Sequence, residues 1–259
     1  MCEECGCGLG GGNVQIGGHS HDHDHPHGHG HDHHHGHSHA PATFTLDLNR
    51  SLMEKNNLLA ERNRVFFRAK KLLVLNIVSS PGSGKTTFIR KTAVQLAGKL
   101  RVGVIVGNLA TDNDAARLKT AGIPVVQITT GTVCHLDADM VSKAAAQLDL
   151  DKVDVLVIEN VGNLVCPADY DLGEDLRVVL LSTTEGEDKP LKYPPMFHSA
   201  HVAIVTKSDM AVAAGFDRDQ ALANLKRVSH HAQVLELSAK TGEGMEVWLD
   251  FLVKHCGKL

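Results

Sequence analysis

The chain has 259 residues, 42% of them hydrophobic, so it can bury one sizeable α/β core and carry an extension. Its formal net charge of −4 provides no general basic field, which argues against nucleic acid and anionic membrane surfaces as partners. No apolar run of about eighteen residues occurs, and the N-terminus lacks the basic-then-apolar order of a secretory signal. We therefore expect a cytoplasmic protein that binds neither nucleic acid nor membranes.

Residues 1–40 are rich in glycine, histidine, aspartate and serine and hold almost nothing that could build a core. Because burial could not offset the entropy lost on ordering, we interpret them as a disordered metal-binding tail. Its first residues include Cys2, Cys5 and Cys7, a spacing that lets a short peptide wrap one soft or borderline metal ion. With a terminal amine the thiolates favour square-planar nickel(II) or copper(II). A redox-labile tail is the alternative.

Twelve of the 18 histidines lie in the tract His19–His39, where they alternate with Asp, Gly, Ser and Pro. Such a tract supplies many interchangeable nitrogen ligands on a chain that can fold around ions, so it predicts storage of several ions at modest affinity. An expression tag is disfavoured because tags are uninterrupted histidine runs. A pH-sensitive solvated tail is the other interpretation.

Residues 41–70 are expected to form a lead-in helix. From Leu46 to about Ala69 apolar residues recur at roughly helical spacing, with charged residues between them. The residues of this stripe are Leu48, Leu52, Leu59 and Phe66. The stripe predicts that the helix packs on the domain that follows.

Residues 71–259 alternate short apolar runs with helical stretches, which is typical of an α/β domain with a mostly parallel central sheet flanked by helices. The expected strands are Leu72–Val78, Val102–Val106, Val125–Ile128, Val153–Ile158, Val178–Leu181, Val202–Val205 and Val234–Leu237. The expected helices are Thr86–Ala97, Asp114–Ala121, Ala138–Leu148, Asp219–Val228 and Gly244–Val253. Ligands of such sheets bind at the carboxyl ends of the strands, where the motifs below fall.

The segment 79–87, SSPGSGKTT, follows the first expected strand and opens a helix, which is the context that a P-loop needs. Its glycines let backbone amides turn inward around phosphates, and the helix N-terminus adds partial positive charge. Lys85 is expected to contact the β and γ phosphates, and Thr86 to ligate Mg²⁺. The predicted phosphate-binding residues are Gly82, Ser83, Gly84, Lys85, Thr86 and Thr87. A glycine-rich turn without a ligand is the alternative.

Two later loops indicate the base. Thr206-Lys207-Ser208-Asp209 follows an apolar strand, and its aspartate can accept both the N1 and the amino protons of guanine, a pair that adenine lacks. The stem of Lys207 is expected to pack along the base. The loop Ser238-Ala239-Lys240 resembles the one that touches the guanine carbonyl in GTPases. Either loop alone would usually be a surface loop, but in this order after a P-loop they favour GTP over ATP.

An acidic residue ends the buried run Val155–Ile158. This residue, Glu159, is expected to act on Mg²⁺ through water, and the backbone amide of Gly162 to sense the γ-phosphate. Asp114 is placed to approach Mg²⁺ from the first switch segment, with Asp112 as the competing choice. A strand-end carboxylate that caps a helix is the alternative for Glu159. The predicted catalytic residues are Lys85, Thr86, Asp114 and Glu159.

A third metal signal lies inside the domain. Cys134 and His135 follow the third expected strand, and Cys166 comes four residues after Gly162. A metal ion held there would respond to movement of the loop that senses the γ-phosphate. Because the pair lies beside a switch and behind two other metal tracts, we predict a metal site. A buried thiol with a satisfied histidine is the alternative.

Together these motifs resemble the HypB family of hydrogenase nickel-incorporation GTPases, SIMIBI-class P-loop proteins related to the urease accessory protein UreG. The segments that carry the resemblance are CxxCGC at 2–7, SSPGSGKTT at 79–87, NDAARL at 113–118, CHLDA at 134–138, ENVGNLVCP at 159–167 and LSTTEGEDKPLKYPPMF at 181–197. The resemblance covers residues 1–7 and 44–259.

The resemblance implies a GTPase that dimerises with GTP and Mg²⁺ and inserts nickel into the large-subunit precursor of [NiFe]-hydrogenase, with a zinc-containing HypA-like partner. It implies a high-affinity nickel site and a separate nickel or zinc site, formed respectively by Cys2, Cys5 and Cys7 and by Cys134, His135 and Cys166. One alternative is a urease-type nickel GTPase, whose motif is Cys-Pro-His. Another is a nickel-storage protein with a regulatory nucleotide site, against which the intact Lys85-Thr86 pair argues.

Overall fold

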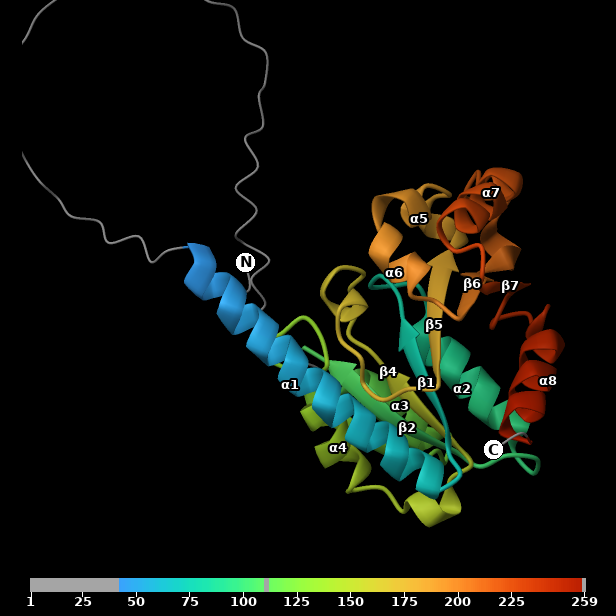
Figure 1. The fold of residues 1–259 in the computed structure, drawn as a ribbon. Helices are drawn as coiled ribbons and strands as arrows, with labels where there is room; N and C mark the ends of the chain where they lie inside the picture. The colour runs from blue at the N-terminus through green and yellow to red at the C-terminus, as the bar shows by residue number, and fades with distance from the viewer. Residues whose placement is uncertain (1–41, 110–111, 258–259) are drawn as a thin grey trace, which may run out of the picture.

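A computed structural model of the protein describes residues 42–109 and 112–257 (Figure 1). The predicted nickel ligands Cys2, Cys5 and Cys7, the His19–His39 tract and the interpretation of residues 1–40 as a disordered tail lie outside the described residues. They remain predictions.

Seven parallel strands form one sheet in the order β3-β2-β4-β1-β5-β6-β7. The strands are β1 Leu73–Val78, β2 Val102–Asn108, β3 Val125–Thr129, β4 Val155–Glu159, β5 Leu176–Ser182, β6 Val202–Thr206 and β7 Gln233–Leu237. All seven expected strands are therefore confirmed. The central strand β1 pairs with β4 and β5, so its carboxyl end lies at the middle of the sheet edge that carries the site.

Helices cover both faces of the sheet (Figure 1). They are α1 Ala42–Ala69, α2 Lys85–Leu96, α3 Asn113–Thr120, α4 Ala138–Ala145, α5 Lys189–Lys192, α6 Pro194–His198, α7 Arg218–Val228 and α8 Met245–Cys256. Helices α5 and α6 were not expected from the sequence, because both are too short to show periodicity and contain prolines. In the described part of the chain, no helix has the length and apolar character needed to cross a bilayer.

Successive side chains of β1 enter different cores because a strand alternates its faces. Leu75 belongs to the core that includes Phe88 of α2 and Trp248 of α8. Val74 belongs to the core on the opposite face, which includes Phe67 of α1. The sheet is thus buried on both sides, as a parallel sheet requires.

Helix α1 spans nearly all the residues expected for the lead-in helix, but the apolar stripe expected to pack on the domain is not its buried face. Leu52 is 52% exposed and Phe66 is 47% exposed. Between residues 51 and 69 of α1, the buried positions recur at helical spacing and include two amides: Asn56, Ala60, Asn63 and Phe67. A stripe defined by hydrophobicity missed this face because its polar members are buried through hydrogen bonds.

Candidate functional site

The P-loop joins β1 to α2. Gly82 and Gly84 have φ values of 76° and 95°, which L-residues rarely adopt, so the local backbone needs both glycines. The Lys85 ammonium group is buried inside the loop and donates to Ser79 Oγ at 3.0 Å and to the Ser80 carbonyl at 3.4 Å. Burial lowers the pKa of Lys85. The loop therefore holds its cation where phosphate oxygens are expected.

Two side chains with oxygen atoms that could ligate a metal ion meet at the carboxyl end of β4. Thr86 Oγ1 donates to Glu159 Oε1 at 2.6 Å, and Glu159 Oε2 is buried without a hydrogen-bond partner among the described residues. Burial raises the pKa of Glu159 to about 7, against the opposing hydrogen bond from Thr86. The Thr86 hydroxyl and the two oxygens of the Glu159 carboxylate suit Mg²⁺, which prefers hard oxygen ligands.

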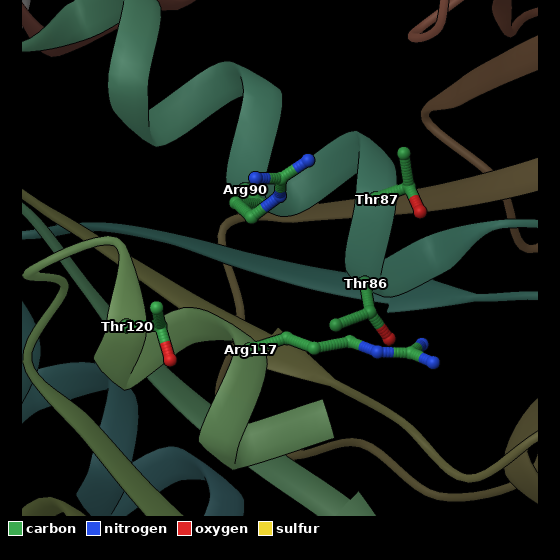
Figure 2. A pocket seen from close by; sticks show the side chains of 5 residues that line it. All are labelled: Thr86, Thr87, Arg90, Arg117 and Thr120. Carbon is green, nitrogen blue, oxygen red and sulfur yellow. The ribbon is translucent and has the colours of Figure 1, made fainter. Parts of the chain in front are cut away.

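A cavity of about 430 Å³ is lined by both Thr86 and Glu159. Asp114 lines it with Glu159, whereas Asp112 stands at the exposed N-cap of α3 and does not. The basic residues that line it are Lys85 and Arg117. Arg117 contacts Asp114 across 3.4 Å and also lines a neighbouring cavity of about 380 Å³, shown in Figure 2 with Arg90 of α2. Arg117 was not among the predicted site residues, although it lies in the NDAARL segment.

Glu159 makes the stability of the metal-free protein depend on pH. Its folded pKa of about 7 lies above the ordinary 4.5, so the folded state keeps a proton that the unfolded chain releases between these values. Stabilisation by this group is complete below pH 4.5 and is lost as pH rises through 7, a loss of roughly 3 kcal/mol. We expect Glu159→Gln to remove this component. Urea unfolding at pH 5 and pH 8 measures it; equal pH slopes in both proteins would contradict the assignment.

Gly162 places the segment after β4 against the P-loop. A Cβ atom on Gly162 would lie 3.0 Å from Pro81 Cα, closer than side chains normally approach backbone. The next residue, Asn163, donates from Nδ2 to the Cys134 carbonyl at 3.1 Å. The segment that lines the 430 Å³ cavity, which is the predicted phosphate cavity, therefore also bonds to the loop that carries Cys134.

The predicted base-binding loops converge on a cavity of about 180 Å³. Lys207, Asp209 and the Ser238-Ala239-Lys240 loop all line it. Ser238 Oγ donates to Asp209 Oδ1 at 2.6 Å, which orients the carboxylate, and Lys207 Nζ donates to the Gly82 carbonyl at 2.9 Å. The hydroxyl of Thr206 donates to the Ser83 carbonyl at 3.4 Å. The base loop therefore supports the P-loop.

Cys134, His135 and Cys166 come together. Their potential ligand atoms all lie within 4.8 Å of one another, and the two sulfurs are 2.9 Å apart. His135 and Cys166 are buried, and Cys134 is half-buried. The ring of Tyr170 stacks on His135 with 3.8 Å between centroids, and Tyr170 was not among the predicted site residues. Thiolates with imidazole suit nickel, zinc or copper better than hard ions.

Comparison with known proteins agrees with this geometry. The profile of the CobW/HypB/UreG nucleotide-binding domain matches residues 73–236. The hydrogenase maturation factor HypB of Escherichia coli K12 is 49% identical over 207 residues, which cover 80% of this chain and 71% of that protein. The hydrogenase/urease maturation factor HypB of Helicobacter hepaticus is 39% identical, covering 80% and 87%.

Among solved structures, HypB from Helicobacter pylori in complex with nickel superposes with a TM-score of 0.76 and 39% identity. The match covers 79% of this chain and 96% of that one. HypB from Archaeoglobus fulgidus gives a TM-score of 0.74 at 38% identity, covering 78% and 99%. The chain therefore belongs to the CobW/HypB/UreG family, on its HypB branch.

Proposed function

We propose that the protein is a GTP-hydrolysing nickel metallochaperone that stores nickel and delivers it for maturation of [NiFe]-hydrogenase. One observation carries the proposal: a single segment, 159–166, contributes to the phosphate cavity at one end and to the Cys134–His135–Cys166 cluster at the other. The hydrogen bond from Asn163 to Cys134 joins the two directly. The nickel-bound relative supports nickel as the cargo, and zinc is the second candidate for this cluster.

Each side chain of the nucleotide site has a role in this proposal. The P-loop amides and Lys85 bind the β and γ phosphates, and Asp209 selects guanine. Thr86 and Glu159, with Asp114, hold Mg²⁺, which neutralises charge on the phosphates when bound. The reaction is GTP and water to GDP and phosphate.

Arg117 is proposed to stabilise charge on the transferring phosphoryl group. When Asp114 serves Mg²⁺, the guanidinium that now faces it at 3.4 Å can turn to the phosphate cavity that it already lines. We expect Arg117→Ala to lower kcat for GTP by about 10- to 100-fold. Arg90→Ala is the matched control, because Arg90 lines only the neighbouring cavity of the two. Affinity for GDP with aluminium fluoride should fall more than affinity for GDP alone; equal losses would contradict this role.

Residues outside the described ranges complete the proposal. We assign the tight nickel site to Cys2, Cys5 and Cys7 and the storage of further ions to the His19–His39 tract. The proposed partners are a HypA-like nickel/zinc protein and the hydrogenase large-subunit precursor in the cytoplasm, with a homodimer that forms with GTP. Delivery to urease is a second candidate, which the name of the H. hepaticus relative favours.

The test of the proposal is nucleotide-dependent metal affinity. Thiolate-to-metal charge-transfer absorption reports the cluster in full-length protein carrying Cys2→Ala, Cys5→Ala and Cys7→Ala, because histidines give no such band. We expect nickel affinity with GDP and with a non-hydrolysable GTP analogue to differ by about tenfold. By linkage, bound nickel should change the ratio of the affinities for the GTP analogue and for GDP by the same factor.

Two variants locate this coupling. Asn163→Ala should shrink the difference between nucleotide states while retaining the band, since it removes the hydrogen bond to Cys134. Cys134→Ala should remove the band itself. Identical affinities in both nucleotide states would refute coupled delivery.

A further inference from the structure

Two asparagines lie on the buried face of α1, where an amphipathic helix would normally place apolar residues. Asn56 is 5% exposed and Asn63 is 6% exposed. They are seven residues apart, so they lie two turns from each other on the same face of the helix. A buried amide is costly unless it is hydrogen-bonded, so its partners show what the helix holds.

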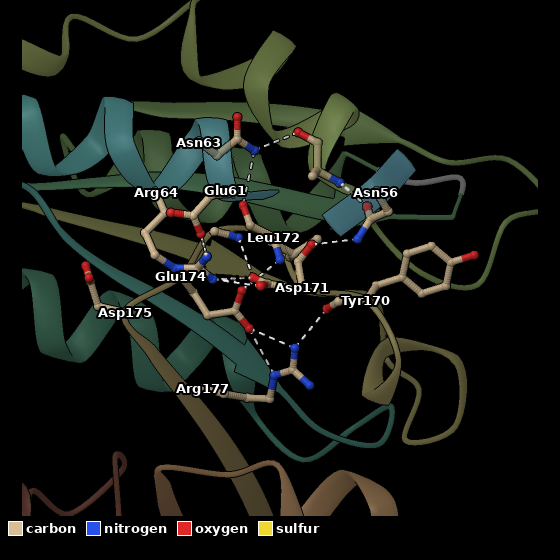
Figure 3. A network of polar contacts seen from close by, with 12 residues as sticks. Asn56, Glu61, Asn63, Arg64, Tyr170, Asp171, Leu172, Glu174, Asp175 and Arg177 are labelled. Atoms are coloured by element: carbon tan, nitrogen blue, oxygen red, sulfur yellow. Dashed lines mark hydrogen bonds and ion pairs between the residues drawn. The ribbon is translucent and has the colours of Figure 1, made fainter. Parts of the chain in front are cut away.

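Both amides bond to the same two segments of the domain (Figure 3). Asn56 Nδ2 donates to the Asp171 carbonyl at 2.9 Å, and Asn56 Oδ1 accepts from the Ala138 amide at 2.9 Å. Asn63 Nδ2 donates to the Ala138 carbonyl at 2.8 Å and to the Leu172 carbonyl at 3.1 Å. All four partners are backbone groups, so these contacts fix the paths of the two segments.

The two segments are those that carry the metal cluster. Ala138 follows His135 by three residues, and Asp171 follows Cys166 by five and adjoins Tyr170, whose ring stacks on His135. The ligands of the cluster thus come from two loops that lie far apart in sequence. Helix α1 forms hydrogen bonds with both segments, at residues that follow the predicted ligands in the chain.

Further contacts hold the second segment to α1. Arg64 Nη2 donates to both carboxylate oxygens of Asp171, at 2.8 and 2.7 Å. A Cβ atom on Gly173 would lie 2.6 Å from the Ala60 carbonyl oxygen, so the loop backbone lies directly against the helix. These contacts fix the distance between α1 and the segment of residues 171–173.

We propose that Asn56 and Asn63 are positioning residues for the metal cluster: they fix the spacing between the loop of Cys134 and His135 and the loop of Cys166. The inference rests on the proposed metal site. Outer residues that orient metal ligands typically alter affinity by about 10- to 100-fold when they are replaced. Helix α1 is therefore part of the metal site although it supplies no ligand.

The test uses full-length protein with Cys2→Ala, Cys5→Ala and Cys7→Ala, titrated with Ni²⁺ or Co²⁺ while the thiolate charge-transfer band is followed. Asn63→Asp keeps the shape of the side chain but places a carboxylate against two carbonyl oxygens. We expect it to weaken metal affinity by about tenfold or more and to shift the band. Asn56→Asp keeps the acceptor for the Ala138 amide and loses only the donor, so its effect should be smaller.

Two controls separate positioning from general damage. Asn57→Ala changes an exposed neighbouring asparagine of α1 and should leave the band unchanged. Leu252→Ala destabilises the distant core of α8 and should lower the unfolding midpoint without altering the band. A wild-type band and affinity in Asn63→Asp, or an equal loss in Leu252→Ala, would overturn the positioning role alone. A parent protein without a Cys134-dependent band would overturn the metal site and the positioning role together.

Discussion

Lys85→Ala is expected to reduce GTP hydrolysis by at least about a hundredfold, the cost typical of removing one preorganised charge from a phosphoryl-transfer or oxyanion site. The ammonium group is buried in the P-loop and bonded to Ser79 and Ser80, so it is already placed for the phosphates. Phosphate release at saturating GTP measures the effect.

The control for this variant is Lys99→Ala, which removes an exposed lysine beyond the end of α2. It should hydrolyse GTP at the wild-type rate. The thiolate–nickel band should survive in Lys85→Ala because the substitution does not touch the cluster, which excludes loss of the fold as the cause. Near-normal turnover in Lys85→Ala would refute the P-loop assignment.

Asp209→Asn is expected to exchange guanine for xanthine specificity. In the protein, Ser238 Oγ donates to Asp209 Oδ1, so an asparagine would keep its oxygen toward Ser238 and turn its amide toward the base. That amide can donate to the extra carbonyl of xanthine but cannot accept the amino protons of guanine. The ratio of kcat/KM for GTP to that for xanthosine triphosphate should fall by about a thousandfold, within the range seen when buried polar groups lose their partners.

Asp219→Asn, on the exposed surface of α7, provides the matched control and should retain wild-type selectivity. Retained GTP selectivity in Asp209→Asn would show that the base lies elsewhere. Equal use of ATP and GTP by the unmodified protein would have the same consequence.

The strands were predictable because each is a run of β-branched and aliphatic residues buried on both faces, as in Val155–Ile158. The two shortest helices were not, since α5 and α6 have fewer residues than two helical turns. The packing face of α1 was predicted wrongly for a different reason. Hydropathy cannot show that Asn56 and Asn63 are buried, because their burial depends on carbonyl groups distant in the chain.

The residues that line the two cavities of the proposed nucleotide site could be picked out from local order, because a P-loop and its later loops are contiguous motifs with fixed strand contexts. The contacts that connect them are not local. Asn163 donates a hydrogen bond to Cys134, which is 29 residues away in the sequence. The ring of Tyr170 stacks on His135, and this contact exists only in the folded chain. Arg117 carried a usable signal, since a cation within NDAARL one helical turn after Asp114 points to the same side of the helix.

The amides of α1 also determine how exactly the helix must dock. A stripe of leucines tolerates small sliding, because apolar contact is non-directional. Amide-to-carbonyl pairs do not, since a shift of one residue would leave Asn56, Asn63 and their backbone partners buried and unpaired, at about 1–3 kcal/mol for each group. Docking of α1 is therefore close to all-or-none: the helix is either in one register or detached. The helix therefore has two states, docked and detached, and no series of intermediate docked positions between them.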